Sequence, residues 1–267
     1  MTEERPEEWK NFEDFSAGIA TNRLPATDKL SGSELSFHLE DSTSLVCNFI
    51  DGNSTKWAIS GGPYNGMSGQ DWYESIEVAL DVLFIDMLFQ SRPRDSMTLI
   101  VNSKTRRVLS ILSKVAKEKK PGVPQVEQEF KTGVLGDPSI KPEGPKPGPT
   151  RDLIGLRTFN RYSPNHLYEH IYLSSERYCW QNLIGEQRGH GDVDLATTYK
   201  FDEDLYLFTF REFLIPVASV FFYNMKDLRS TGKFLGIKST GEISNDASGA
   251  YIQKASMTFY PKDAEPV

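Results

Sequence analysis

Two histidines and five aromatic rings lie within residues 162–180, YSPNHLYEHIYLSSERYCW. Imidazole titrates near neutral pH, and aromatic side chains with polar tips line many small-molecule sites. Aromatic rings are equally common on the buried faces of β-sheets, and a histidine in a strand is often structural. The stretch therefore indicates a functional site only if other segments bring further chemistry to it.

A carboxylate on an apolar strand face is such a candidate. In residues 205–214, LYLFTFREFL, side chains alternate between the two faces of a strand. One face carries Tyr206, Phe208, Phe210, Glu212 and Leu214. Burial would raise the pKa of Glu212 and suit it to proton transfer. The alternative is that Glu212 reaches water or pairs with Arg211 or Arg229.

The stretch LYEHIYL, residues 167–173, predicts a strand with two different faces. We expect its aromatic face to look into a barrel, with Tyr168 and His170 pointing at the same cavity as Glu212. The next strand would continue that wall with Tyr178, Trp180 and Asn182. Glu169, on the other face, would then pack against the other half of the chain and need a basic partner there. The opposite orientation would place Glu169 and Glu212 together as a carboxylate pair, and periodicity alone does not decide.

The glycine-rich stretch GEQRGHGDVD, residues 185–194, carries Arg188, His190 and Asp192. It is either an ordinary solvated loop or a mobile rim that offers a cation to an anionic substrate.

Metal and nucleotide chemistry are not indicated. His166 and His170 share a strand face but would lie about 13 Å apart, too far to share an ion. The sequence has no GxGxxG before a helix, no P-loop, no GxSxG and no HExxH. We expect no metal and no cofactor.

The elements that position these residues are short runs of β-branched or aromatic residues, separated by turns of Gly, Asn, Asp and Ser. Such runs follow one another through both halves of the chain and predict an all-β fold of antiparallel barrels or sandwiches. Helix is expected only at residues 11–19 and 108–118, and the second of these also fits a strand.

Composition divides the chain into four parts. Residues 1–27 form an N-terminal segment and residues 28–115 a first module. Residues 116–150 are rich in Pro, Gly and Lys and are expected to be a linker. Residues 151–267 form a second module, which carries the candidate site.

The two modules look like an internal duplication. Trp57 and Trp180 are 123 positions apart, while Leu83 and Leu205 are 122 apart. The offset of 122 places Gln90 opposite Glu212, so the first module is expected to lack the acid and to be structural.

Charge and hydropathy limit the partners. A net charge of −7 argues against nucleic-acid binding, which normally needs a basic surface. No apolar run is long enough to span a membrane, and the acidic N-terminus has no apolar stretch behind it, which favours a cytoplasmic protein. Cys47 and Cys179 suggest buried thiols rather than a disulfide framework.

The sequence resembles the MoaF family, which is associated with molybdenum-cofactor biosynthesis. The resemblance is carried by YESIEVALDVLFIDML and MTLIVNSKTRRVLSIL in the first half, and by RYSPNHLYEHIYLSSERYCW, DEDLYLFTFREFLIP and LRSTGKFLG in the second. It implies two tandem antiparallel lipocalin-like (calycin) barrels with little helix.

The second half also resembles, more distantly, the phenolic acid decarboxylases, which are single lipocalin-like barrels that act without a cofactor. The resemblance implies that Glu212 stands at the position of the catalytic glutamate and Tyr162 at one of two substrate-binding tyrosines. Asn160 stands at the other tyrosine, and the catalytic arginine would fall near Arg188 or His190.

Two functions follow. The first is a cofactor-independent lyase, isomerase or cyclase acting on a small hydrophobic or aromatic metabolite in the second barrel. Its expected catalytic residues are Glu212, Tyr162, Arg188 and His170. Its expected substrate-binding residues are His166, Tyr168, Trp180, His190, Tyr206, Phe208 and Phe210. The second is a lipocalin-like small-molecule carrier, or an accessory factor in molybdenum-cofactor biosynthesis. In both cases the partner is a small molecule rather than a nucleic acid or a membrane, and a homodimer stays open.

Overall fold

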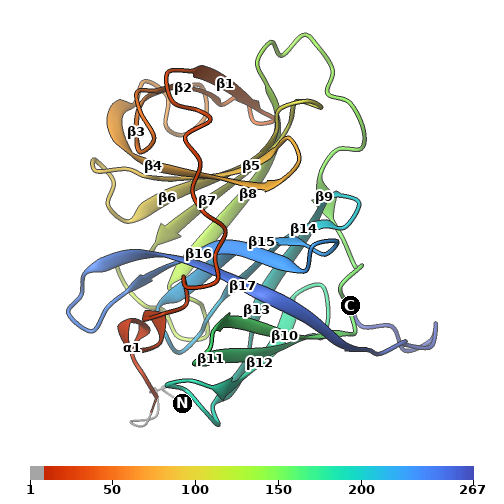
Figure 1. Cartoon of the computed structure of the whole chain (residues 1–267). Coiled ribbons are helices and arrows are strands. Elements are labelled where there is room, and N and C mark those ends of the chain that lie inside the picture. Colours follow the sequence, from red (N-terminus) through yellow and green to blue (C-terminus); the bar gives the residue numbers. More distant parts are fainter. Residues whose placement is uncertain (1–8) are drawn as a thin grey trace. The chain divides into compact units, whose positions relative to one another are not determined.

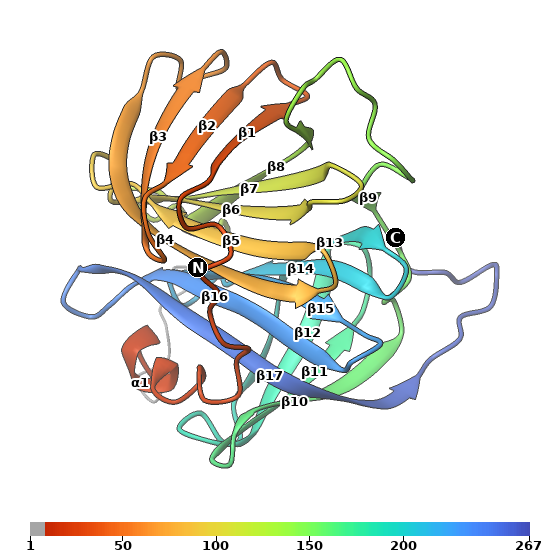
Figure 2. The same ribbon diagram turned by 45° about the horizontal axis from the view of Figure 1, so that its top comes forward.

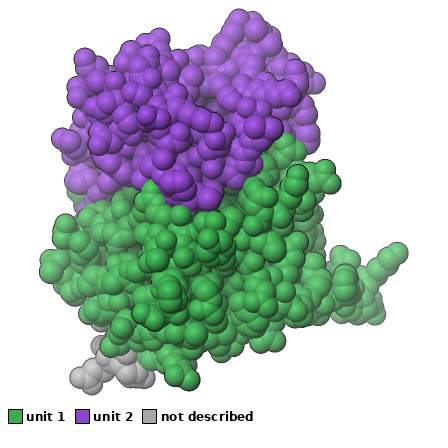
Figure 3. Space-filling view, viewed as in Figure 1, with its two compact units in different colours: residues 1–23, 115–127, 149–267 green, residues 24–114, 128–148 purple. Residues whose placement is uncertain are grey.

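The computed structural model describes residues 9–267, and these residues form β-strands almost throughout (Figure 1; Figure 2). The only helix within this range is α1 (Phe12–Ser16). The described residues divide into two compact units, coloured in Figure 3. One unit comprises residues 24–114 and 128–148, and the other comprises residues up to 23, 115–127 and 149–267.

The first unit is a closed eight-stranded antiparallel barrel. Its strands, in chain order and in barrel order, are β1 (Glu34–Leu39), β2 (Ser44–Phe49), β3 (Ser54–Ser60), β4 (Ser68–Ala79), β5 (Val82–Leu88), β6 (Asp95–Asn102), β7 (Arg107–Val115) and β8 (Val126–Leu135). Buried and exposed side chains alternate along a strand that has one face toward the core. In β3, Thr55, Trp57 and Ile59 are buried while their neighbours are exposed or half-buried. Pairing of β1 with β8, through Phe37 and Leu135, closes the barrel.

The second unit repeats this up-and-down order. Its strands are β10 (Leu156–Ser163), β11 (His166–Tyr172), β12 (Arg177–Ile184), β13 (Gly191–Asp202), β14 (Leu205–Arg211), β15 (Val217–Asn224), β16 (Arg229–Ile237) and β17 (Ile243–Met257), with the short β9 (Gly148–Pro149) beside β13. Pairing of β10 with β17 completes the ring. The predicted all-β class with two tandem lipocalin-like barrels is confirmed.

Residues 116–150 are not a linker throughout, and that prediction is wrong for β8. The stretch VEQEFKTGVL carries valine, phenylalanine and leucine between the Pro- and Gly-rich parts, enough apolar surface for a strand. Without this eighth strand, β1 would present an unpaired edge. The composition of the segment predicted a linker, but closure of the barrel requires a strand there.

The N-terminal segment also departs from its predicted role as a separate part. Its described residues up to Arg23 belong to the unit of the second barrel, and residues from Leu24 onwards belong to the first. Phe12, Phe15 and Ile19 are buried in the core of the second barrel. Only Phe12–Ser16 of the expected helix 11–19 is helical, and residues 107–115 form strand β7, which is the alternative reading of that stretch.

The two barrels share local features that define the duplication more closely than the sequence did. Asp81 and Asp204 both have positive φ in the hairpins before β5 and β14, and they are 123 positions apart. Arg106 and Leu228, also at positive φ, are 122 apart. The offset therefore changes in the loop after β5 and β14, which is one residue shorter in the second barrel.

A buried tryptophan–aspartate hydrogen bond occurs at the same place in each barrel. Trp57 Nε1 donates to Asp71 at 2.7 Å, and Trp180 Nε1 donates to Asp194 at 2.9 Å. The other oxygen of each carboxylate accepts a backbone N–H, from Gln90 in the first barrel and from Phe213 in the second.

Gln90 therefore corresponds to Phe213, and the expected match of Gln90 with Glu212 is wrong. The residue opposite Glu212 is Phe89, which packs on Trp57 with ring centroids 4.9 Å apart. The first barrel thus has an apolar ring where the second has a carboxyl group.

We expect Trp57→Phe and Trp180→Phe each to lower the free energy of unfolding by roughly 1–3 kcal/mol, because each leaves a buried aspartate without its indole donor. Chemical denaturation measures the effect. Trp72→Phe is the matched control, since Trp72 is 39% exposed and its replacement should cost less than about 0.5 kcal/mol. Equal effects of all three variants would contradict the prediction.

Candidate active site in the second barrel

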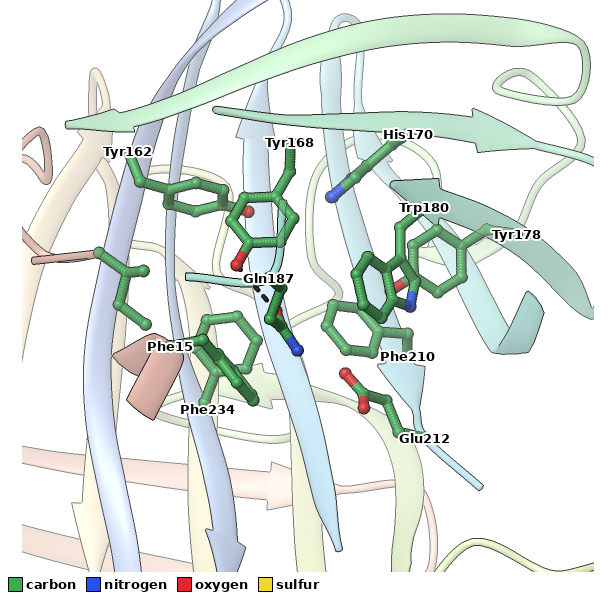
Figure 4. A pocket seen from close by; sticks show the side chains of 11 residues that line it. Phe15, Tyr162, Tyr168, His170, Tyr178, Trp180, Gln187, Phe210, Glu212 and Phe234 are labelled. Carbon is green, nitrogen blue, oxygen red and sulfur yellow. Dashed lines mark hydrogen bonds between the residues drawn. The ribbon is translucent and has the colours of Figure 1, made fainter. Parts of the chain in front are cut away.

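The interior of the second barrel contains a cavity with largely aromatic walls (Figure 4). Its lining residues are Phe15, Ile19, Tyr162, Tyr168, His170, Tyr178, Trp180, Gln187, Phe210, Glu212 and Phe234. They come from α1 and the residues after it, β10, β11, β12, the 185–190 loop, the end of β14, and β16. The cavity volume is about 30 Å³, which is room for roughly two water molecules.

Strand β11 turns its aromatic face inward, as the sequence predicted. Tyr168 and His170 line the cavity together with Glu212, and all three side chains point into the same space in Figure 4. Glu169 lies on the other face, where it forms an ion pair with Arg157 and accepts a hydrogen bond from Gln181. The basic partner that Glu169 needs is therefore supplied by the neighbouring strand β10 of the same barrel.

Glu212 follows the last residue of β14 and is 6% exposed. Within residues 9–267 its carboxyl group has no hydrogen-bond or ion-pair partner. Burial raises the pKa of Glu212 well above its usual value, and the nearby Asp194 and Asp192 raise it further. Burial therefore favours the neutral, protonated form of Glu212, which can donate a proton into the cavity.

The arginines considered as partners for Glu212 are engaged elsewhere. Arg211 lies on the opposite face of β14 and donates to Thr197 Oγ1 and to the carbonyl of Ala196. Arg229 lies over the ring of Tyr251 and donates to the carbonyl of Asn22.

Asp194 on β13 is a second carboxylate of the site, and the sequence reasoning missed it. It is fully buried, and burial raises its pKa to about 7. Its bonds from Trp180 Nε1 and from the backbone of Phe213 hold the chain next to Glu212. The signal was present as a repeated spacing, because each barrel has an aspartate fourteen positions after its tryptophan.

His170 is a neutral imidazole. It is 3% exposed, and burial lowers its pKa to about 3. Its Nδ1 is buried and has no hydrogen-bond partner among the described residues. His170 therefore offers the cavity a neutral polar group, and at neutral pH it carries no charge that could stabilise an anion.

The 185–190 loop contributes an amide to the cavity rather than a cation. Gln187 is buried, and its Oε1 accepts a hydrogen bond from Tyr168 OH at 2.8 Å. Arg188, predicted to be catalytic, is exposed and does not line the cavity. Adjacent residues of a loop point in different directions, so the sequence could not distinguish Gln187 from Arg188.

The two remaining histidines of this region also lie outside the cavity lining. His166 Nδ1 bonds with Ser163 Oγ at 2.8 Å, and its ring lies against Gly18. His190 packs against Trp9, with ring centroids 5.6 Å apart. Their predicted substrate-binding roles find no support in this geometry.

Tyr206 and Phe208 share the inward face of β14 with Glu212 but lie farther along the barrel. Tyr206 OH donates to Asp152 at 3.1 Å and lines a different hollow. Six residues of strand span about 20 Å, so Tyr206 and Glu212 are near opposite ends. Phe208, with no exposed surface, packs among His170, Tyr172 and Tyr178 as part of the core.

Among residues 9–267, no three His, Cys, Asp or Glu side chains are grouped so that they could hold a metal ion. No helix in the same range is long and apolar enough to cross a membrane.

Closed eight-stranded up-and-down barrels are typical of the lipocalin-like class, and both barrels of this chain belong to it. Models of the MoaF N-terminal and MoaF C-terminal domains match residues 7–117 and 147–258 respectively. Protein MoaF of Klebsiella aerogenes is 30% identical over a 253-residue alignment, and the match covers 90% of each chain. The chain belongs to the MoaF family.

Solved structures give weaker likenesses. A putative β-lactamase from Burkholderia vietnamiensis aligns with 43% of this chain and 98% of its own, at 18% identity and a TM-score of 0.34. The β chain of DNA polymerase III from Streptococcus pneumoniae aligns with 90% of this chain and 82% of its own, at 7% identity and a TM-score of 0.13. Similarity at these TM-scores carries no argument about function.

Proposed function

We propose that the second barrel is a cofactor-independent lyase or isomerase that binds a small, apolar or aromatic molecule and uses Glu212 as general acid and base. The observation that carries the proposal is the Glu212 carboxyl group, buried in an aromatic cavity without a partner in the described residues. Perturbed carboxyl groups in such cavities are typical of acid–base sites.

The duplicated barrel supports this interpretation. At the position of Glu212 the first barrel has Phe89, which fills the core against Trp57. The fold therefore accepts an apolar ring at this position. A buried carboxyl group there lowers the stability of the folded state and is not needed for folding. A buried polar residue at a position where the related barrel has an apolar one is a candidate for function.

The chemistry follows from the protonation state. Neutral Glu212 gives its proton to one carbon or oxygen of a conjugated substrate, and the resulting carboxylate removes a proton from another position. Atoms and charges balance in this isomerisation without a cofactor. Tyr162 and the Tyr168–Gln187 pair are placed to hold a polar group of the substrate.

A carrier or accessory role is the second candidate, and the aromatic lining favours it. Seven of the lining side chains are Phe, Tyr or Trp, which would retain an apolar ligand whether or not it reacts. Membership of the MoaF family is compatible with this role, including an accessory role in molybdenum-cofactor biosynthesis.

A metabolite screen separates the two candidates. Compounds that raise the melting temperature of the protein are incubated with wild type and with Glu212→Gln, and products are sought by mass spectrometry. We expect a compound that binds both proteins and is converted only by wild type. Ligands that bind both proteins and leave both unchanged would make the protein a carrier.

A further inference from the structure

The cavity has an unusual combination of walls. Aromatic rings surround the carboxyl group, among them Tyr178 and Phe210, whose ring centroids lie 4.9 Å apart. None of the described residues lining it is lysine or arginine. The loop arginine, Arg188, is exposed outside it.

The charges nearest the cavity are acidic. Asp194 and Asp192 both act on the Glu212 carboxyl group, and Glu186 acts on Tyr168. Arg177 acts on Asp194 from outside the cavity lining and lies over the ring of Phe213. An anionic ligand such as a carboxylate would meet these acidic groups without a cation to pair with it.

Two buried polar groups in the cavity lack partners in the described part of the chain. The Glu212 carboxyl group, 6% exposed, can accept hydrogen bonds once ionised. The Nδ1 atom of His170, 3% exposed, can accept one as a neutral ring nitrogen. Figure 4 shows both side chains directed into the cavity. An ammonium group supplies three donors and a positive charge, and aromatic faces attract cations.

We infer that the cavity takes a small organic amine with a flat apolar substituent, whose ammonium group pairs with the Glu212 carboxylate between aromatic rings. This inference rests on and deepens the proposed function, because it names the substrate class of the same site. With an amine bound, Glu212 starts as the carboxylate, so it removes a proton from the substrate first and then returns that proton to another position. His170 and the amide of Gln187 then receive the remaining ammonium hydrogens, and the rings hold the substituent.

Binding must be coupled to proton release. Burial and the two nearby aspartates favour the protonated form of Glu212 in the empty site, so an ammonium ion that pairs with the carboxylate releases that proton to solvent. Asp194, Asp192, Tyr168, Tyr178 and His170 also face or act on this group; the tyrosines and His170 stay neutral near pH 7. Affinity for the amine should therefore rise with pH, by up to tenfold per pH unit while Glu212 is mainly protonated.

A ligand larger than two waters needs more room than the cavity now has. Phe15 and Ile19 of the N-terminal segment lie outside the barrel strands and line the cavity. Displacement of these side chains makes room without opening the barrel.

The test is a calorimetric series of aryl-alkyl amines of increasing length, starting with benzylamine, each matched with its alcohol and its carboxylate. We expect at least one amine to bind ten times more tightly than its alcohol, with the carboxylate weaker still. Repeating the titration in buffers of different ionisation enthalpy should show release of up to one proton for the amine and none for the alcohol. Glu212→Gln should abolish both the preference and the proton release.

Glu203→Gln is the matched control, because Glu203 is an exposed glutamate of the same barrel that lies outside the cavity lining. It should keep the preference for the amine within about threefold. The inference is overturned if no amine in the series binds more tightly than its alcohol, or if the preference survives in Glu212→Gln. Such a result leaves the proposed acid–base function standing if the metabolite screen finds a converted compound. Conversely, if amines bind but no compound is converted, the amine-binding inference is supported and the proposed enzymatic function is rejected.

Discussion

Glu212→Gln is expected to lower turnover by about 10²–10⁴-fold on a substrate of the second barrel, because a positioned acid–base group typically supplies that factor. Glutamine keeps the shape of the side chain but cannot donate or accept the proton. The fold should survive, since an amide avoids the cost of ionising a buried carboxyl group. Steady-state kinetics with the compound found in the screen measures the effect.

Two further measurements guard the assignment of Glu212. Glu203→Gln, at an exposed glutamate outside the cavity lining, should keep turnover within a few-fold of wild type. Circular dichroism should show that Glu212→Gln is folded. Wild-type turnover in a folded Glu212→Gln protein would remove Glu212 from the mechanism.

The buried carboxyl pair should also make the stability of the protein depend on pH. Asp194 has a pKa of about 7 in the folded protein against 3.8 for the ordinary side chain, and the pKa of Glu212 is raised in the same direction. A raised pKa means that the folded state holds the proton more tightly than the unfolded state does. Its stabilising contribution is complete below about pH 4 and is lost as the pH rises through about 7.

The expected size is large for a single site. At about 1.4 kcal/mol for each tenfold change in proton affinity, the Asp194–Glu212 pair accounts for on the order of a few kcal/mol between pH 4 and pH 8. We expect the free energy of unfolding of wild type, measured by urea denaturation, to fall relative to Asp194→Asn over this range. The comparison with the variant cancels the surface carboxylates, such as Glu40 and Asp41, whose lowered pKa values act in the opposite direction.

Asp71→Asn supplies the matched control, because Asp71 accepts the same two hydrogen bonds in the first barrel beside Phe89. The stability difference between wild type and Asp194→Asn should change more between pH 4 and pH 8 than the difference between wild type and Asp71→Asn, because only Asp194 has a second buried carboxyl group nearby. Parallel curves for wild type and Asp194→Asn would show that Asp194 titrates normally, and the electrostatic description of the site would then fail.

The features that the sequence determined by itself are local ones. Alternation along β14 and β11 placed Glu212 on one face with Phe208 and Phe210, and Tyr168 on one face with His170, because the direction of a strand side chain follows from its position along the chain. Alternation did not decide which face of β11 looks inward. The repeated strands and the two tryptophans revealed two similar barrels. These inferences need only neighbouring residues and a spacing.

Only the tertiary structure decided which inward-facing residues meet. Tyr206 and Glu212 share a face yet lie near opposite ends of the barrel, and Asp194 acts on the Glu212 carboxyl group from another strand. Phe15 comes from a segment far away in the sequence. The stagger between strands and the packing of distant segments determine which of these residues lie close together. Neither can be derived from the alternation of side chains along a single strand.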